Sequence, residues 1–164
     1  MAEPNRPIQT FNSPAETGMR ALILLAESYP RQLDLQRILE YDYMMVHTGD
    51  VEGGPPSIHP ALPLRSGELL VRRQLIERGL LLMLSRGLIS RHATSLGFLY
   101  QAEDDAGPFL DALTAEYFDD LKDRATWVVE RFGDVSDRDI RTMLTTVYDQ
   151  WSREFQAPEQ PGLF

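Results

Sequence analysis

The sequence predicts a mainly α-helical protein with a winged-helix-like domain, and three observations lead to this fold class. Apolar residues recur at the 3.6-residue spacing of helices in several long segments. Residues 88–102 alternate around a turn that contains Gly97, a pattern typical of a β-hairpin. The hairpin follows the third helix, and in winged-helix domains the helix before the hairpin is the recognition helix.

The first two helices have well-defined starts. Ser13 is placed to cap a helix over 14–29, with Glu16 as its reciprocal capping partner. The second helix is expected over 34–47, and its apolar face contains one polar residue, Asp42.

The remaining pattern is also helical apart from the hairpin. We expect a third helix over 66–86, and after the hairpin further helices over 105–113, over 114–132 with Thr114 as N-cap, and from Ser136, again an N-cap, to about 155. We therefore divide the chain into a winged-helix-like domain, residues 11–113, and a C-terminal helical extension, residues 114–156. Residues 1–10 and 157–164 are expected to be flexible tails.

Composition excludes several classes of function. The chain has 164 residues and a net charge of -9. It contains no cysteine, and this absence excludes thiol catalysis, disulfide scaffolds and cysteine-ligated zinc. The longest apolar runs, at 21–26 and 79–84, are far shorter than a membrane span, and the N-terminus has no signal-peptide pattern. We expect a soluble cytoplasmic protein.

The basic residues are concentrated in one window. Residues 65–92 hold six arginines against Glu68 and Glu77, a local charge of +4 (six minus two). Arginine suits both carboxylates and phosphates, so this window predicts an arginine face for an acidic protein surface (Arg65, Arg72 and Arg73) and candidate DNA contacts (Arg78, Arg86 and Arg91). The third alternative is a solvated face, because Glu68 with Arg72 and Glu77 with Arg73 are spaced for helical ion pairs.

A long loop rich in proline and glycine, residues 48–66, precedes the third helix. Prolines hold a backbone extended, so the loop can pack on its own domain, form a preformed docking edge, or do both, with one face inward and one outward. We assign it four candidate partner-binding residues, His47, Asp50, Ser57 and His59. A metal site or a serine hydrolase here is disfavoured by the spacing, and the loop lacks a phosphate-binding glycine motif. Acidic groups at 103–105 and 116–120 are typical of solvated helix starts.

The chain also resembles a known family, through the segments FNSPAETGMRALILLAE, LDLQRILEYDYMMVHTGD, GPPSIHPALPLRSGELLVRRQLIERGLLLMLSRGLI, GFLYQAEDDAGPFLDAL and RATWVVERFG. These segments, which cover about residues 11–133, are similar to the middle component (type 2) of ABC-three-component anti-phage systems, a group that includes Lamassu. The most distinctive block is H-T-G-D…P-P-S-I-H-P…R-S-G-E-L. The resemblance implies a small non-enzymatic subunit, encoded between an SMC-like ABC ATPase and a variable effector that is often a nuclease.

These observations lead to a functional hypothesis with two alternatives. We expect a non-enzymatic adaptor without a cofactor or a metal, which bridges and regulates the ATPase and the effector, with DNA contact in the complex as a further option and no membrane partner. The first alternative is a stand-alone winged-helix transcription regulator that binds DNA. The second is a small metal-dependent hydrolase.

Overall fold

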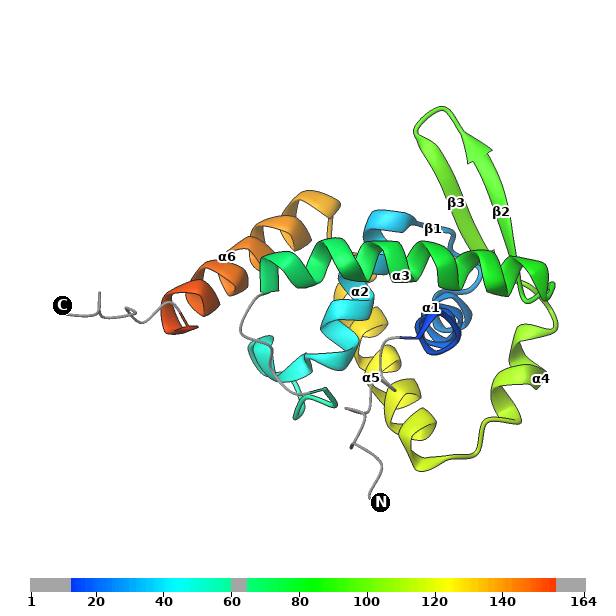
Figure 1. The fold of residues 1–164 in the computed structure, drawn as a ribbon, viewed down its shortest axis with the longest axis horizontal. Helices are drawn as coiled ribbons and strands as arrows, with labels where there is room; N and C mark the ends of the chain where they lie inside the picture. Colours follow the sequence, from blue (N-terminus) through cyan, green and yellow to red (C-terminus); the bar gives the residue numbers. More distant parts are fainter. Residues whose placement is uncertain (1–12, 60–64, 156–164) are drawn as a thin grey trace, which may run out of the picture.

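The computed structural model describes residues 13–59 and 65–155, with side chains described for 13–59 and 71–147. This part folds into six α-helices and a small three-stranded antiparallel sheet (Figure 1). The helices are α1 (Pro14–Ser28), α2 (Leu35–Val46), α3 (Arg65–Ser85), α4 (Ala106–Asp111), α5 (Glu116–Phe132) and α6 (Asp137–Phe155), with a 3-10 turn at Thr48–Asp50. The strands are β1 (Leu33–Asp34), β2 (Ile89–Thr94) and β3 (Gly97–Ala102). The prediction of a mainly helical protein with a hairpin is confirmed.

Most helix starts agree with the sequence analysis. The Ser13 hydroxyl accepts the N–H of Glu16 at 3.2 Å, and the Ser136 hydroxyl accepts the N–H of Asp139 at 3.1 Å. The prediction for Thr114 was wrong, because α5 begins two residues later, after Ala115, whose side chain makes no capping bond. Glu16 has a different partner from the one expected, since its carboxyl group hydrogen-bonds Tyr117 on α5.

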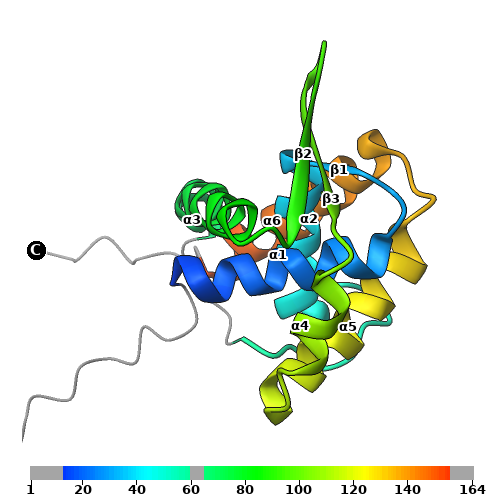
Figure 2. The same ribbon diagram turned by 90° about the vertical axis from the view of Figure 1, so that its right-hand side faces the viewer.

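The sheet contains one strand that the sequence did not reveal. β1 pairs with β3 through Leu33 opposite Tyr100 and Asp34 opposite Leu99, which gives the strand order β1-β3-β2. Two residues are too few for an alternating pattern to be recognised. The β2–β3 hairpin is as predicted: its turn ends at Gly97, whose φ of 122° suits glycine. The hairpin projects beyond the helices (Figure 2).

One core joins the helices to the sheet. α5 packs against α1 and α2, and its residues Leu121, Ala125 and Val128 are fully buried beside residues of the first three helices. The division at 113/114 stays a prediction, although α5 shares the core of the preceding residues. Within the described ranges, no helix is both long enough and apolar enough to cross a bilayer.

The tightest helix contact lies between α1 and α3, where two glycines face each other. A Cβ on Gly79 would lie 2.6 Å from the backbone nitrogen of Gly18 and 2.9 Å from the carbonyl oxygen of Pro14. These neighbours are backbone atoms, so they cannot move aside as a flexible side chain would. The close approach sets the position of α3 on the body.

We therefore predict that Gly79→Ala lowers the free energy of unfolding by about 1–3 kcal/mol through overpacking. Gly107→Ala in α4 is the matched control, because a Cβ there would meet nothing within 4 Å. That variant should change stability by less than about 1 kcal/mol. Chemical denaturation of both variants checks the contrast, and equal effects would contradict the packing argument.

Candidate functional site

A buried carboxylate lies where the first three helices meet. Asp42 of α2 is fully buried and binds Arg20 of α1 and Arg72 of α3. Arg20 donates to both carboxylate oxygens, at 2.7 and 3.2 Å, and Arg72 donates to one of them. Burial raises the pKa of Asp42, but the two guanidinium groups outweigh this effect and lower it to about 2. Asp42 is therefore ionised at neutral pH and holds α1 and α3 together.

A second set of polar groups extends this centre toward α5 and the loop. The Tyr117 hydroxyl lies 2.7 Å from Nε2 of His59 and hydrogen-bonds the carboxyl group of Glu16. Burial, together with the nearby positive charge of Arg20, lowers the pKa of His59 to about 3, so the imidazole is neutral at physiological pH. Burial also raises the pKa of Glu16. We call Glu16, Arg20, Asp42, His59, Arg72 and Tyr117 the polar cluster.

The loop after α2 folds back on the end of that helix. The N–H groups of Ile58 and His59 both donate to the carbonyl of Val46, at 3.1 and 3.0 Å. The Ser57 hydroxyl accepts the N–H of Gly49 at 2.9 Å. These bonds place the ring of His59 inside the protein, 6.2 Å from the ring of His47.

The loop also packs on α5. Arg124 of α5 donates to the carbonyl of Pro56 at 3.1 and 3.2 Å, and Thr48 donates to the same oxygen at 3.1 Å. Val51 is buried. Of the two alternatives for this loop, packing on its own domain holds for residues 51–59, and residues 60–64 lie outside the described ranges.

The structure separates the four loop candidates. His47 and His59 are buried, at 2% and 7% exposure, so neither faces a partner directly. Asp50 is half-buried and accepts the Tyr43 hydroxyl at 2.7 Å, and Ser57 is exposed although its oxygen holds Gly49. A binding role for the accessible residues stays a prediction.

The predicted arginine face is also divided. Arg72 is 5% exposed and belongs to the polar cluster, so the expectation that it forms an exposed face with Arg65 and Arg73 is corrected. Asp42, the polar residue on the apolar face of its helix, draws Arg72 inward. Arg73 is exposed and pairs with Glu77 at 3.5 Å, as the spacing predicted. The side chain of Arg65 lies outside the described residues.

The three candidate DNA contacts are exposed. Arg78 lies on α3, Arg86 follows directly after its last residue, and Arg91 lies on the hairpin with its guanidinium 4.2 Å from the ring centre of Phe98. Among the arginines of the basic window whose side chains are described, they are the ones outside the ion pairs of Arg72 and Arg73. The acidic residues at 103–105 and at 116, 119 and 120 are exposed beside the starts of α4 and α5, as expected.

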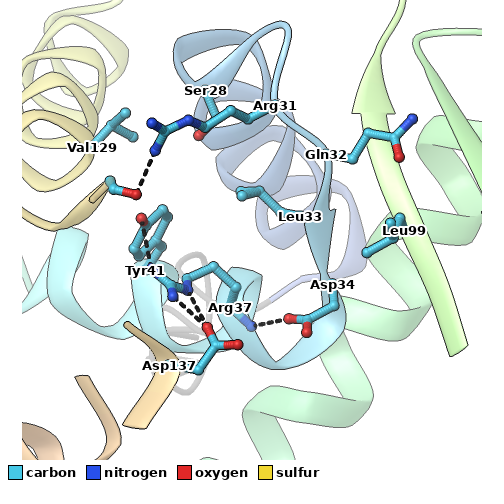
Figure 3. Close-up of a pocket in the computed structure, with 11 residues that line it drawn as sticks. Ser28, Arg31, Gln32, Leu33, Asp34, Arg37, Tyr41, Leu99, Val129 and Asp137 are labelled. Atoms are coloured by element: carbon cyan, nitrogen blue, oxygen red, sulfur yellow. Dashed lines mark hydrogen bonds and ion pairs between the residues drawn. The ribbon is translucent and has the colours of Figure 1, made fainter. Parts of the chain in front are cut away.

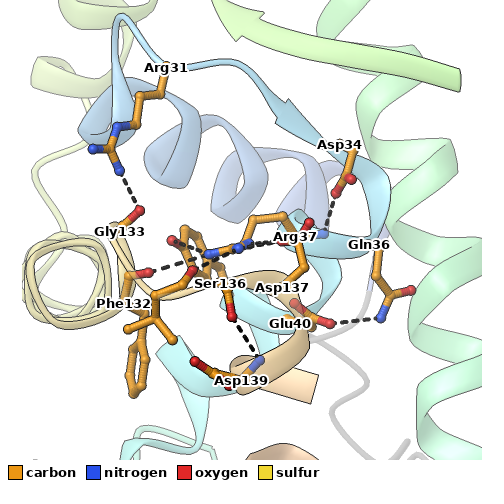
Figure 4. A network of polar contacts seen from close by, with 12 residues as sticks. Arg31, Asp34, Gln36, Arg37, Glu40, Phe132, Gly133, Ser136, Asp137 and Asp139 are labelled. Carbon is orange, nitrogen blue, oxygen red and sulfur yellow. Dashed lines mark hydrogen bonds and ion pairs between the residues drawn. The ribbon is translucent and has the colours of Figure 1, made fainter. Parts of the chain in front are cut away.

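A polar pocket of about 220 Å³ lies at the opposite end of α1, between the α1–α2 connection and the α5–α6 turn (Figure 3). Arg37 donates to Asp137 and to the carbonyls of Phe132 and Val135, and Arg31 donates to the carbonyl of Gly133 (Figure 4). The two arginines therefore fasten the α5–α6 turn to the N-terminal helices. The sequence analysis did not find this contact, because about 100 residues separate the partners.

The grouping of the ionisable side chains bears on the kind of site that the described residues form. Among the described residues, no three histidine, aspartate or glutamate side chains are grouped to hold a metal ion. The ionisable groups of the polar cluster are buried, apart from the half-buried Tyr117, and bind one another. The arrangement suits a structural role for the cluster and leaves the outer face of α3 as the accessible candidate surface.

We predict that Asp42→Asn lowers the free energy of unfolding by about 3–5 kcal/mol, because two buried guanidinium groups lose their anion. Asp134→Asn is the control: its side chain is 93% exposed, and its pair with Arg31 should contribute less than about 1 kcal/mol. Because the pKa of Asp42 is below its usual 3.8 in the folded state, its contribution is complete above pH 3.8 and is lost as the pH falls toward 2. Denaturation curves across this range should show that loss, of about 2 kcal/mol, in the wild type and its absence in Asp42→Asn; parallel curves would refute the assignment.

The two arginines at the pocket should differ in the same way. The Arg37 side chain is 12% exposed and donates to several carbonyls, so Arg37→Met should lower the free energy of unfolding by about 2–3 kcal/mol. The Arg31 side chain is 55% exposed, and Arg31→Met should change the free energy of unfolding far less than Arg37→Met does. Thermal unfolding of both variants measures the two losses of stability. A larger loss for Arg31→Met than for Arg37→Met would contradict the prediction.

Comparison with known proteins agrees with the resemblance seen in the sequence. Searches of curated proteins and of solved structures gave no match. A family model described as ABC-three component (ABC-3C) system Middle Component 2 matches residues 10–154. Because this match spans most of the described helices and the hairpin, the chain belongs to the Middle Component 2 family of ABC-three-component systems.

Proposed function

We propose that the chain is a non-enzymatic adaptor of a defence complex, which binds an SMC-like ABC ATPase and an effector and regulates one through the other. Family membership carries this proposal, because a middle component belongs to a system of three components. The Lamassu-like anti-phage role and the identity of the two partners are part of the proposal.

We also infer that residues 14–102 form a winged-helix domain. The chain order α1, β1, α2, α3, β2, β3 supports this inference, as does a sheet in which β3 lies between β1 and β2. In such a domain α3 is the recognition helix and the hairpin is the wing. Both elements are accessible on one side of the protein (Figure 1).

The state of the ionisable groups supports a function without catalysis. A general base needs a pKa near the working pH, whereas burial lowers the pKa of His59 to about 3. Asp42, the most deeply buried carboxylate, is held by two arginines. Both residues stabilise the fold and are shielded from a substrate.

An adaptor can regulate without chemistry if it distinguishes two states of its partner. A subunit that binds one nucleotide state of an ATPase more tightly shifts the ATPase toward that state, and the effector attached to it responds. The rigid attachment of α3 to the body suits this role, because a preformed surface loses little entropy on binding.

The alternative, a stand-alone DNA-binding regulator, is supported by the exposed Arg78, Arg86 and Arg91. Two observations weigh against it. Arg72 and Arg73 are paired within the chain, and the net charge of -9 opposes the approach of nucleic acid.

The proposal predicts a stable complex. The full chain, tagged and expressed with the ABC ATPase and the effector of its own system, should co-purify with both in fixed ratio. The chain alone should show no sequence-specific DNA binding at nanomolar concentration in 150 mM salt. Specific DNA binding by the isolated chain, with no association with either protein, would instead establish the regulator.

A further inference from the structure

The outward side of α3 carries a straight row of exposed residues. Ile76, Leu80 and Met83 face the core, and the residues on the opposite side of the helix are spaced by three or four positions. These residues, which we call the outer stripe, are Val71, Gln74, Arg78, Leu81 and Ser85. At 1.5 Å per residue the outer stripe is about 21 Å long.

The outer stripe is partly apolar. Val71 is 57% exposed and Leu81 is 56% exposed, so two large aliphatic side chains ten residues apart lie in solvent along one line. Single exposed aliphatic residues are common, but here two lie on the same side of one helix with Arg78 between them in the sequence. Two aliphatic positions on either side of a polar centre match the packing of one helix along another.

The charge of the outer stripe is positive. Arg78 is its charged member, and in the described part of α3, residues 71–85, the sole carboxylate is that of Glu77, which pairs with Arg73 at 3.5 Å. Most of the negative charge of the chain, by contrast, lies elsewhere: the segment from 103 to 139 alone holds twelve acidic residues against four lysines and arginines. A partner surface that complements the outer stripe is therefore aliphatic with a carboxylate near its centre.

We propose that the outer stripe is the docking surface for a helix of a partner subunit, whose contacting face carries aliphatic side chains and a carboxylate that binds Arg78. This inference rests on the proposed adaptor function and adds to it the surface and the chemistry of the partner. The polar cluster and the glycine contact hold α3 from the other side, through Arg72 and Gly79, so the surface is rigid before the partner binds.

Protein and DNA would use different residues here. A protein helix gains most from Val71 and Leu81, which offer nothing to phosphate. DNA would gain most from the cations beside the outer stripe, Arg86 at the end of α3 and Arg91 on the hairpin. The presence of the two aliphatic residues on the outermost line of the helix favours protein.

The test measures binding of the purified full chain to each of the two other subunits of its system by titration calorimetry. The double variant Val71→Ser with Leu81→Ser, and separately Arg78→Glu, should weaken binding to one subunit at least tenfold. Tyr29→Ser is the matched control, since Tyr29 is 58% exposed but lies at the end of α1. It should change the Kd less than twofold, and thermal unfolding should show all the variants folded.

The outcomes separate the inference from the function on which it rests. If the wild type binds neither subunit, both fail. If the wild type binds and the outer-stripe variants bind equally well, the adaptor stands and this surface is overturned. If Arg86→Gln with Arg91→Gln abolishes binding to the subunits and Val71→Ser with Leu81→Ser does not, the cations beside the outer stripe form the docking surface and the inference is wrong. Sedimentation of the isolated chain tests self-association. If Leu81→Ser converts an oligomer to a monomer, the outer stripe binds a second copy of the chain, and the inference of a partner subunit is overturned.

Discussion

The pairing of Asp42 with Arg20 and Arg72 is the constraint on which the rest of the structure depends, because it joins three helices through one carboxylate. Hydrophobic packing tolerates small shifts of one helix on another, whereas a fully buried ion pair does not, since any separation leaves charges without solvent. The carboxylate therefore specifies how α1, α2 and α3 are placed relative to one another. The close approach of Gly18 and Gly79 fixes the same helices by shape.

The same constraint explains the loop that follows α2. Through Glu16 and Tyr117, the polar cluster reaches His59, and the bonds at Val46 and Gly49 return the loop to the helix that it left. A Cβ on Gly54 would lie 2.1 Å from the carbonyl oxygen of Thr48, so that position requires glycine. The most distinctive block of the sequence thus contains residues that fold the loop, and its histidines are internal.

Local features of the fold could be predicted from the sequence, and features that depend on distant pairing could not. Periodicity gave the helices, and Ser13 and Ser136 gave their starts, because those signals lie within a few residues. β1 and the late start of α5 have no such signal. Asp42 stood out as a polar residue on an apolar face, but nothing in the sequence shows that its partners are Arg20 and Arg72, 22 and 30 residues away. Tyr117 gave no signal at all.

Arg72 was predicted at the surface but is buried, and this changes how the charge of the basic window should be understood. Counted along the sequence, six arginines oppose two glutamates, as on a nucleic-acid-binding surface. In the structure Arg72 neutralises Asp42 in the core and Arg73 neutralises Glu77 at the surface, so that Arg78, Arg86 and Arg91 are the exposed, described arginines of the window outside these two ion pairs. Three arginines spread over a helix and a hairpin attract polyanions weakly on a chain of net charge -9. Beside exposed aliphatic residues they are well suited to orient a protein partner, since charge contributes register and apolar area contributes affinity.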